Sequence, residues 1–277
     1  MTSADRGQAT VDEYFDTAAD YWREVYEADD LQGLVYRRRQ ETALAWVREL
    51  GLPESAQALD AGCGAGLMSV ALAGEGLQVT ATDSSPQMVA LTTQRAAAEG
   101  LSDRVEVQRA DAHRLPFAGG AFSLVLALGL LPWLSDPAAA VAELTRVLAP
   151  GGWLLLTADN ERRLNRLVEP KESPLLAPLK EARRRLRQAA GPQPAGAQAY
   201  RHRCEDVDGL LRAAGVEAVK RTTVGYGPFT FLSRPALTNR AGTRLHLALE
   251  HAAARHPRLR SGGWHYVVLG RHLPADL

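Results

Sequence analysis

The strongest structural signal in this sequence is the run Ala58-Leu59-Asp60-Ala61-Gly62-Cys63-Gly64-Ala65-Gly66. It joins a short apolar segment to a glycine-rich turn that holds one acid, Asp60. Glycine has no Cβ, so a backbone built on Gly62, Gly64 and Gly66 can turn tightly between a strand and a helix and approach a ligand closely. A glycine triplet is weak by itself, because dinucleotide sites use the similar spacing G-x-G-x-x-G. The residues that follow must decide what the turn binds.

A second acid, Asp83, ends the alternating segment Leu77 to Thr82 and lies 23 residues beyond Asp60. In doubly wound α/β folds a carboxylate at the end of the second strand accepts hydrogen bonds from sugar hydroxyls, and ligands collect at the carboxyl ends of the strands. The glycine spacing here is G-x-G-x-G with an acid just before it, and that acid would repel a pyrophosphate. It would attract the ammonium and the sulfonium of S-adenosylmethionine, so spacing and charge favour this ligand over a dinucleotide.

At this point the chain resembles the class I S-adenosylmethionine-dependent methyltransferases. Ala110-Asp111-Ala112, followed by Leu115-Pro116-Phe117, is similar to the family's third strand end and adenine-contacting turn, and Ala121 to Leu128 is similar to its fourth strand. Leu144 to Gly152 resembles the helix and turn before the fifth strand. The resemblance covers Leu44 to Asn160 well and implies S-adenosylmethionine as the cofactor.

The resemblance also implies a set of cofactor-binding residues. Asp60 and the three glycines would surround the methionine part, Asp83 would hold the ribose, and Asp111 would lie near the adenine. The full set comprises Asp60, Gly62, Cys63, Gly64, Gly66, Asp83, Ser84, Met88, Asp111, Ala112 and Leu128.

Composition favours a soluble enzyme. The chain has 277 residues, 46% of them hydrophobic, which is enough to bury a full core. Lysine plus arginine and aspartate plus glutamate each total 32, so the net charge indicates neither nucleic acid nor a membrane. No apolar run approaches the ~20 residues that span a bilayer, and the start lacks a signal pattern. We expect a cytoplasmic protein that acts on a small molecule without a nucleic-acid partner; its oligomeric state stays open.

Short apolar runs alternate with helical patterns, which predicts an α/β fold with a mostly parallel sheet. The expected strands span residues 56–61, 77–82, 104–109, 122–128, 152–158, 217–225 and 264–271. One helix is expected over Gln40 to Leu50, and others open at Ser85-Pro86 and Asp136-Pro137. With the resemblance, this predicts a seven-stranded Rossmann-like sheet with helices on both faces, an antiparallel edge formed by the last two strands, and a helical cap insertion.

Four parts follow from this plan. Residues 1–50 form an amino-terminal helical lid and the first core helix, and residues 51–160 form the cofactor-binding core. Residues 161–200 form a basic helical insertion, and residues 201–277 complete the core sheet with a helical excursion.

The insertion, from about Glu161 to Ala199, is rich in basic residues. Its apolar residues keep helical spacing at Leu164 to Val168 and at Leu175 to Leu179, which predicts two short amphipathic helices. A solvated helical cap is one interpretation. The other is a basic lid, including Arg183-Arg184-Arg185, that recruits an acidic substrate, an anionic lipid head group or a carrier-bound acyl chain.

The excursion between the last two strands begins with the apolar, turn-rich segment Tyr226 to Leu232 and continues with a helical pattern over Asn239 to His256. Its aromatic residues either cover the sheet edge or line an apolar substrate pocket. In the second case Tyr226, Phe229 and Phe231 are the pocket walls.

Aromatic residues are also concentrated before the sheet begins. Tyr14, Phe15 and Trp22 carry enough apolar area to dock this segment, although terminal segments are usually mobile. Tyr14 and Trp22 either belong to a lid over the site or pack as ordinary helix residues. Trp22 and Trp133, the latter in the turn after the fourth strand, are further candidates for the substrate pocket.

The sequence does not identify which residue, if any, acts as a general base. Many relatives in the resembled family place a catalytic histidine at the turn after the fourth strand. Here that turn reads Leu128-Gly129-Leu130-Leu131-Pro132-Trp133, without a histidine. The remaining catalytic candidates are His113, which follows Asp111, His265 in the last strand, and Tyr14. Alignment of donor and acceptor can supply most of the rate without a base.

Two further features concern the ends of strands and metals. Asp159 and Asn160 follow the fifth strand, where they could orient a substrate or cap the next helix; capping is preferred. Cys63 and Cys204 are too few for a disulfide framework or a zinc cluster, and we expect no metal.

Three functions compete. The first is methylation of an apolar secondary metabolite or tetrapyrrole-like acceptor, which would place the protein in natural product biosynthesis. The second is methylation of a lipid or quinone precursor at a membrane surface, suggested by the basic insertion. The third is a cofactor-binding or pericyclic scaffold that no longer methylates, suggested by the missing histidine.

Overall fold

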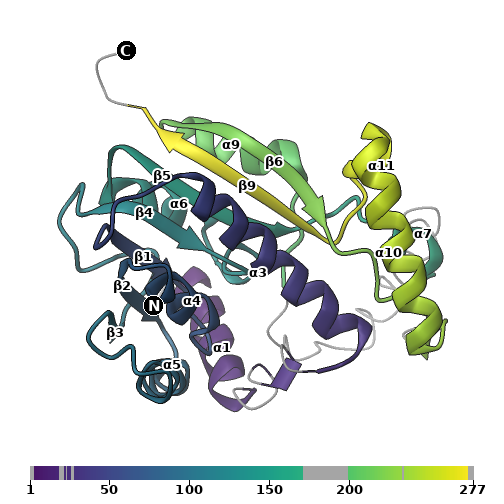
Figure 1. The fold of residues 1–277 in the computed structure, drawn as a ribbon, viewed down its shortest axis with the longest axis horizontal. Coiled ribbons are helices and arrows are strands. Elements are labelled where there is room, and N and C mark those ends of the chain that lie inside the picture. The colour runs from purple at the N-terminus through teal and green to yellow at the C-terminus, as the bar shows by residue number, and fades with distance from the viewer. Residues whose placement is uncertain are drawn as a thin grey trace.

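A seven-stranded sheet with strand order β3-β2-β1-β4-β5-β9-β6 forms the centre of the molecule (Figure 1). The computed structural model describes residues 3–18, 22, 24–25, 28–170, 199–232 and 234–273. The strands are β1 Gln57–Ala61, β2 Gln78–Asp83, β3 Val105–Arg109, β4 Phe122–Ala127, β5 Leu148–Asp159, β6 Val216–Val224 and β9 His265–His272. A separate hairpin consists of β7 Thr230–Phe231 and β8 Arg234–Pro235. The predicted seven-stranded Rossmann-like sheet is confirmed; β5 begins at Leu148, earlier than expected.

Strand pairing brings the carboxyl ends of five strands to one edge. β1 pairs in parallel with β2 and β4, and the parallel pairs continue to β3 on one side and to β5 on the other. β9 lies between β5 and β6 and is antiparallel to both, as expected for the edge. His265, the first residue of β9, therefore faces Asp159, the last residue of β5.

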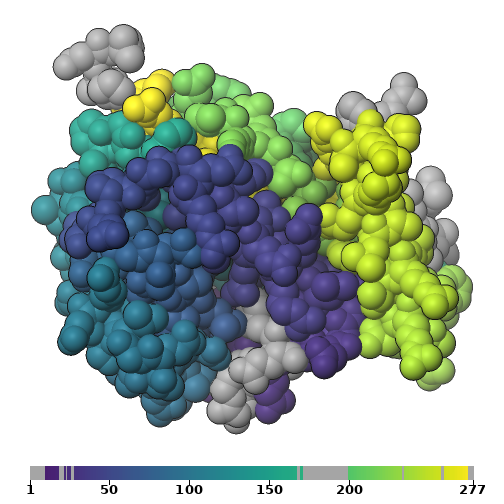
Figure 2. All heavy atoms as spheres, in the orientation of Figure 1, coloured from purple at the N-terminus to yellow at the C-terminus, as the bar shows by residue number. Residues whose placement is uncertain are grey.

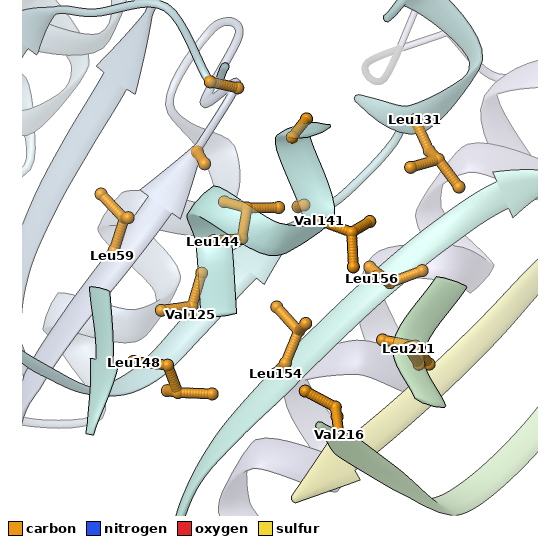
Figure 3. Packing of buried hydrophobic residues seen from close by; sticks show 14 of the residues in the cluster. Leu59, Val125, Leu131, Val141, Leu144, Leu148, Leu154, Leu156, Leu211 and Val216 are labelled. Atoms are coloured by element: carbon orange, nitrogen blue, oxygen red, sulfur yellow. The ribbon is translucent and has the colours of Figure 1, made fainter. Parts of the chain in front are cut away.

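Helices cover both faces of the sheet because successive strand residues point to opposite sides. Leu154 and Leu156 pack with α6 (Pro137–Val147) and α9 (Cys204–Ala213) on one face, which Figure 3 shows from close by. Leu155, between them, packs on the other face with α3 (Leu31–Glu49) and α4 (Leu67–Gly74).

The helix starts follow the sequence signals. The Ser85 hydroxyl accepts a hydrogen bond from Met88 N–H at the start of α5 (Pro86–Ala98), and the Asp136 carboxylate caps α6 in the same way. α3 is longer than the predicted helix: it begins at Leu31, where the Asp30 carboxylate accepts from Gly33 N–H.

Three peripheral elements complete the described fold. α1 (Ser3–Thr17) lies against α5, while α10 (Asn239–Arg255) and α11 (Pro257–Arg260) stand beside the amino-terminal end of α3 (Figures 1 and 2). A short helix, α7 (Asn165–Val168), lies where the first insertion helix was expected, and residues 171–198, including the second, lie outside the described residues. No helix in the described ranges has both the length and the apolar character required to cross a membrane.

Candidate active site

Three glycines in left-handed backbone shape the loop between β1 and α4. The angle φ is +69° at Gly62, +55° at Gly64 and +77° at Gly66. A Cβ on Gly62 would lie 2.8 Å from Leu130 Cδ1, and one on Gly66 would lie 2.8 Å from Thr92 Cγ2. A Cβ on Gly64 would meet no atom within 4 Å. Close packing therefore requires glycine at 62 and 66, whereas Gly64 leaves open space beside the loop.

A cavity at the carboxyl ends of the strands collects ten of the eleven predicted cofactor residues. Its wall contains Asp60, Gly62, Cys63, Gly64, Asp83, Ser84, Met88, Asp111, Ala112 and Leu128. Gly66 is outside this wall and serves as the residue before α4. The loop and the ends of four adjacent strands, β3, β2, β1 and β4, thus enclose one binding space.

Two acids lie beside the glycine loop in the cavity wall: Asp60, which is buried, and Asp83, which is half-buried. Asp60 is 2% exposed, and its Oδ2 accepts a 2.6 Å hydrogen bond from the Ser69 hydroxyl. Asp83 accepts backbone N–H bonds of 3.0 Å from Gly64 and from Ser85. Burial, with a smaller contribution from a neighbouring carboxylate (Asp83 for Asp60 and Asp12 for Asp83), raises the pKa of each acid to about 6. A cationic ligand would relieve this repulsion, so the residues present fit S-adenosylmethionine.

His113 lies outside the cavity wall and supports the turn that carries Asp111. Its Nδ1 lies 2.7 Å from Asp111 Oδ1, and its Nε2 lies 3.4 Å from the N–H of Asp136. The hydrogen bond to Asp111 raises the pKa of His113 and lowers that of Asp111. These contacts make His113 a brace between two turns.

Helix α1 closes one side of the cavity. Val11 and Phe15 belong to the cavity wall. The Ser84 hydroxyl donates to Asp12 Oδ1 at 2.8 Å, and the Ser85 hydroxyl donates to Asp16 Oδ1. Two hydrogen bonds therefore tie α1 to the residues that directly follow Asp83.

An aromatic wall adjoins the cofactor loop and consists of Tyr14, Phe15, Trp22, Tyr36 and Trp133. Tyr14 stacks on Trp133 with ring centroids 5.4 Å apart, and Phe15 meets the same ring edge-on at 5.0 Å. Trp22 meets Tyr36 edge-on at 5.8 Å. Four of the five line the cavity, and Tyr14 supports Trp133 without lining it. Trp22 and Trp133 thus lie where an acceptor pocket was expected.

His265 is fully buried and lies behind Asp159. It is 1% exposed, is absent from the cavity wall, and places Nδ1 3.3 Å from Asp159 Oδ1. Burial lowers the pKa of His265 to about 4, and the charges of Arg39 and Arg163 act in the same direction. Its imidazole is therefore neutral at pH 7.

Asp159 faces the cavity instead of capping a helix. Burial acts to raise its pKa, but His265 and the charges of Arg163 and Arg39 outweigh that effect and lower it. Asn160 does not cap a helix either: its Oδ1 accepts from Arg162 N–H at 2.9 Å within a turn, and its amide donates to the carbonyls of Ser261 and Gly263 before β9. The next helix, α7, begins only at Asn165 and has no side-chain cap.

Sequence reasoning missed three wall residues from α3: Tyr36, Arg39 and Gln40. The helix was expected to start only at Gln40, so the preceding turn was not considered. The signal was present, because Leu31, Val35, Arg39, Ala43 and Val47 are spaced by four residues and all are buried. A charged residue at a core position of an apolar helical stripe predicts a buried charge, which is rare in a protein core and typical of a binding site.

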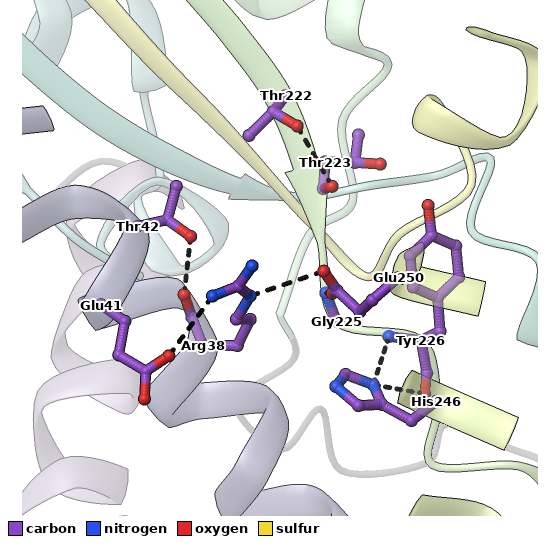
Figure 4. Close-up of polar contacts among 9 residues, drawn as sticks. All are labelled: Arg38, Glu41, Thr42, Thr222, Thr223, Gly225, Tyr226, His246 and Glu250. Atoms are coloured by element: carbon purple, nitrogen blue, oxygen red, sulfur yellow. Dashed lines mark hydrogen bonds and ion pairs between the residues drawn. The ribbon is translucent and has the colours of Figure 1, made fainter. Parts of the chain in front are cut away.

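Tyr226, Phe229 and Phe231 do not line this cavity, so the predicted pocket wall needs correction. Tyr226 is 2% exposed and packs with Leu31 and Val35 in a separate core cluster that includes Phe229. Its backbone contacts His246 of α10 (Figure 4), and its hydroxyl donates to the Leu259 carbonyl at 2.7 Å. Phe231 is 53% exposed on the hairpin. The loop therefore packs between α10 and α3. The prediction was wrong because apolar composition is typical of a core as well as of a pocket.

The described start of the basic insertion is held by ion pairs. Arg162 Nη1 lies 2.8 Å from Glu205 Oε1, and Arg203 Nε lies 3.1 Å from Glu161 Oε2. Arg183, Arg184 and Arg185 lie outside the described residues.

Comparisons with known proteins agree with this geometry. A family model described as "Methyltransferase domain" matches residues 59–156. A ubiquinone biosynthesis O-methyltransferase of Xanthomonas axonopodis pv. citri is 34% identical over 108 residues, which cover 39% of this chain and 45% of that protein. A sterol 4-C-methyltransferase of Caenorhabditis elegans is 28% identical over 142 residues, 51% of this chain and 41% of that protein. The chain thus matches less than half the length of these two relatives.

Solved structures share the fold across most of the chain. A magnesium protoporphyrin IX methyltransferase from Synechocystis PCC 6803 with bound S-adenosylmethionine has a TM-score of 0.64 and 17% identity, covering 98% of this chain and 100% of that chain. The 4+2 cyclase SpnF has a TM-score of 0.56 and 23% identity, covering 84% of this chain and 80% of that chain. At these identities the likeness establishes the fold.

Proposed function

We propose that this chain, which belongs to the class I S-adenosylmethionine-dependent methyltransferases, transfers the methyl group of that cofactor to an apolar small molecule. One observation carries the proposal: the same cavity is lined by the glycine loop, by Asp60 and Asp83, and by four of the five residues of the aromatic wall. Sites for small molecules usually combine such apolar surfaces with a few polar groups. A secondary metabolite or a tetrapyrrole-like compound fits this description.

The residues of the chain would act mainly by alignment. When bound, S-adenosylmethionine supplies an electrophilic methyl carbon. Asp83 would accept hydrogen bonds from sugar hydroxyls, and Asp60 would face the positive charge of the methionine part. Helix α1 would exclude water through its bonds to Ser84 and Ser85. Alignment of two reactants is worth roughly 7 to 11 kcal/mol, which suits a site whose turn after β4 has glycine and leucines instead of a histidine.

A labelled-methyl assay over a panel of apolar hydroxylated and carboxylated acceptors tests the proposal. With an accepted substrate, Trp133→Ala should lower kcat/KM at least about tenfold, because the stacked ring at the centre of the aromatic wall is lost. Trp153→Ala is the matched control. Trp153 belongs to β5, lies outside the cavity wall, and packs against the guanidinium of Arg271 from β9. Equal losses in both variants would argue against an acceptor site at the aromatic wall.

A quinone or lipid precursor is a second candidate acceptor, favoured by the ubiquinone biosynthesis O-methyltransferases among the relatives. Cosedimentation with anionic vesicles at low salt distinguishes it. A membrane-surface enzyme should bind such vesicles and lose binding when Arg183, Arg184 and Arg185 are neutralised.

The labelled-methyl assay also addresses the non-methylating alternative. Persistent absence of methyl transfer despite tight cofactor binding would favour a scaffold role, such as the one named for the cyclase with the same fold.

A further inference from the structure

Arg39 is a buried cation in the wall of the cavity. Its side chain is 4% exposed, and it lies in the buried stripe of α3 between the apolar residues Val35 and Ala43. The guanidinium carbon lies 5.1 Å from the Tyr36 ring centroid. A Cβ on Gly129 would lie 2.6 Å from Arg39 Nη1, so the guanidinium rests on the bare backbone of the turn after β4. Glycine at 129 makes room for this cation.

The strand order separates Arg39 from three of the four acids in the cavity wall. Asp60, Asp83 and Asp111 belong to β1, β2 and the turn after β3, which occupy one half of the sheet. Arg39 lies beside the turn after β4, the first strand of the other half. The half with the three acids suits a cationic cofactor. In the half that begins with β4, Arg39 places a permanent cation beside the aromatic wall.

Asp159 lies in the same half and gives the cation a polar neighbour. The charges of Arg39 and Arg163 both favour the ionised form of Asp159 and the neutral form of His265. The two arginines therefore contribute to the protonation states at the ends of β5 and β9, where burial and the contact between Asp159 and His265 have the larger effects. A carboxylate in this position accepts hydrogen bonds from hydroxyl or amine groups.

We propose that Arg39 recognises a carboxylate on the methyl acceptor, while Asp159 orients a hydrogen-bond donor on the same molecule against the aromatic wall. This inference rests on the proposed function. It defines the acceptor as an apolar ring system that carries an acid group, and Arg39 and Asp159 as its specificity-determining residues. A guanidinium pairs with the two oxygens of a carboxylate through parallel N–H bonds, which fixes orientation as well as charge.

Binding measured without catalysis tests this assignment. The probes are hydroxylated one-, two- and three-ring aryl carboxylates, such as 1-hydroxy-2-naphthoate, each paired with its methyl ester. Quenching of Trp22 and Trp133 fluorescence would report binding in the presence of S-adenosylhomocysteine. For at least one ring size, the acid should bind about tenfold or more tightly than its ester, because a hydrogen bond to a charged group is lost in the ester.

Substitutions then assign the preference to Arg39. Arg39→Gln should give the acid and its ester equal affinity, and Arg39→Lys should keep part of the preference. Arg38→Gln is the matched control. Arg38 directly precedes Arg39 on α3, and its side chain is 47% exposed and pairs with Glu41 and Glu250 (Figure 4). If Arg39→Gln fails to fold, the comparison of acid and ester in the unmodified protein and in Arg39→Lys still decides.

Each outcome separates this inference from the proposed function. Absence of an acid preference at every ring size, or its persistence in Arg39→Gln, overturns the inference, even if a neutral compound is methylated. Preferential binding of an acid without methyl transfer to any acceptor supports the inference and counts against the proposed activity.

Discussion

The backbone N–H of Gly64 donates a 3.0 Å hydrogen bond to Oδ2 of Asp83, which ties the glycine loop to the end of β2. The acid expected to hold the ribose also holds the loop expected to surround the methionine part. A change at Asp83 therefore acts on both parts of the cofactor site.

Asp83→Asn should weaken binding of S-adenosylmethionine about tenfold or more. The amide keeps one acceptor oxygen but loses the charge that a sugar hydroxyl and a cationic ligand would meet. Titration calorimetry measures the affinity, and Asp103→Asn, at an exposed position, is the control. An unchanged affinity would remove Asp83 from the cofactor site.

Binding of the cofactor should depend on pH through Asp60 and Asp83. Burial is the main reason that the pKa of each is about 6. Below pH 6 these carboxyls are protonated in the free protein, so they must release protons before they can face a cation. We expect the affinity to rise from pH 5 to pH 7.5, with proton release near pH 5.5 that calorimetry in buffers of different ionisation enthalpy would detect. A flat profile would contradict the assignment of both acids.

The same raised pKa values make the stability of the free protein fall as pH rises, whereas the affinity for the cofactor increases. A carboxyl with a raised pKa in the folded state contributes stability that is complete below its unfolded pKa, near 3.9, and is lost as pH rises through about 6. Asp83→Asn lacks this titration, so its unfolding free energy relative to the unmodified protein should rise from pH 4 to pH 7.5. The change is on the order of 3 kcal/mol at most. Urea unfolding at both pH values measures it.

The lid helix should control release of the cofactor. Replacing Asp12 and Asp16 by asparagine weakens their bonds to Ser84 and Ser85, and we expect cofactor dissociation to speed up about fivefold to tenfold. Stopped-flow fluorescence would measure the rate. Glu13→Gln, on the exposed side of the same helix, should leave it unchanged. Equal rates in all three proteins would mean that α1 does not retain the cofactor.

Gly64 and Gly66 should differ in their tolerance of alanine. Both have positive φ, so alanine costs roughly 1 to 2 kcal/mol of backbone strain at each. At Gly66 the new Cβ would also lie 2.9 Å from Thr92 Cα, which adds about 1 to 3 kcal/mol of overpacking. Urea unfolding of the free protein should therefore show the larger loss for Gly66→Ala. A larger loss for Gly64→Ala would contradict the packing described for this loop.

The sequence predicted the sheet well because both of its faces are buried. β4 and β5 contain the apolar runs Leu124 to Ala127 and Trp153 to Leu156, and these runs are local in the sequence. The start of β5 at Leu148 was missed because Pro150, Gly151 and Gly152 interrupt its apolar pattern. The glycine loop and Asp83 are also local signals, since each follows a strand directly. Most of the residues predicted to bind the cofactor therefore line one cavity, although they were chosen from sequence order alone.

The acceptor half could not be predicted in the same way. Tyr226 and Trp133 both lie in apolar turns, and only tertiary packing places one in a core cluster and the other in the cavity wall. Arg39 belongs to the run Arg37-Arg38-Arg39, which resembles a solvated helix face, and only the burial of its stripe reveals a different environment. The position of His265 behind Asp159 depends on the register of two distant strands.

The insertion of β9 between β5 and β6 implies an order of assembly. The glycine loop, Asp60 and Asp83 belong to β1, α4 and β2, which follow one another along the chain, so their contacts close short loops. The pairing of Asp159 with His265 closes a much longer loop, and contacts between distant residues carry a larger entropic cost and form later. We therefore expect the half of the sheet with the glycine loop to form first during folding, so that the proposed site for the methyl donor is complete before the proposed site for the acceptor.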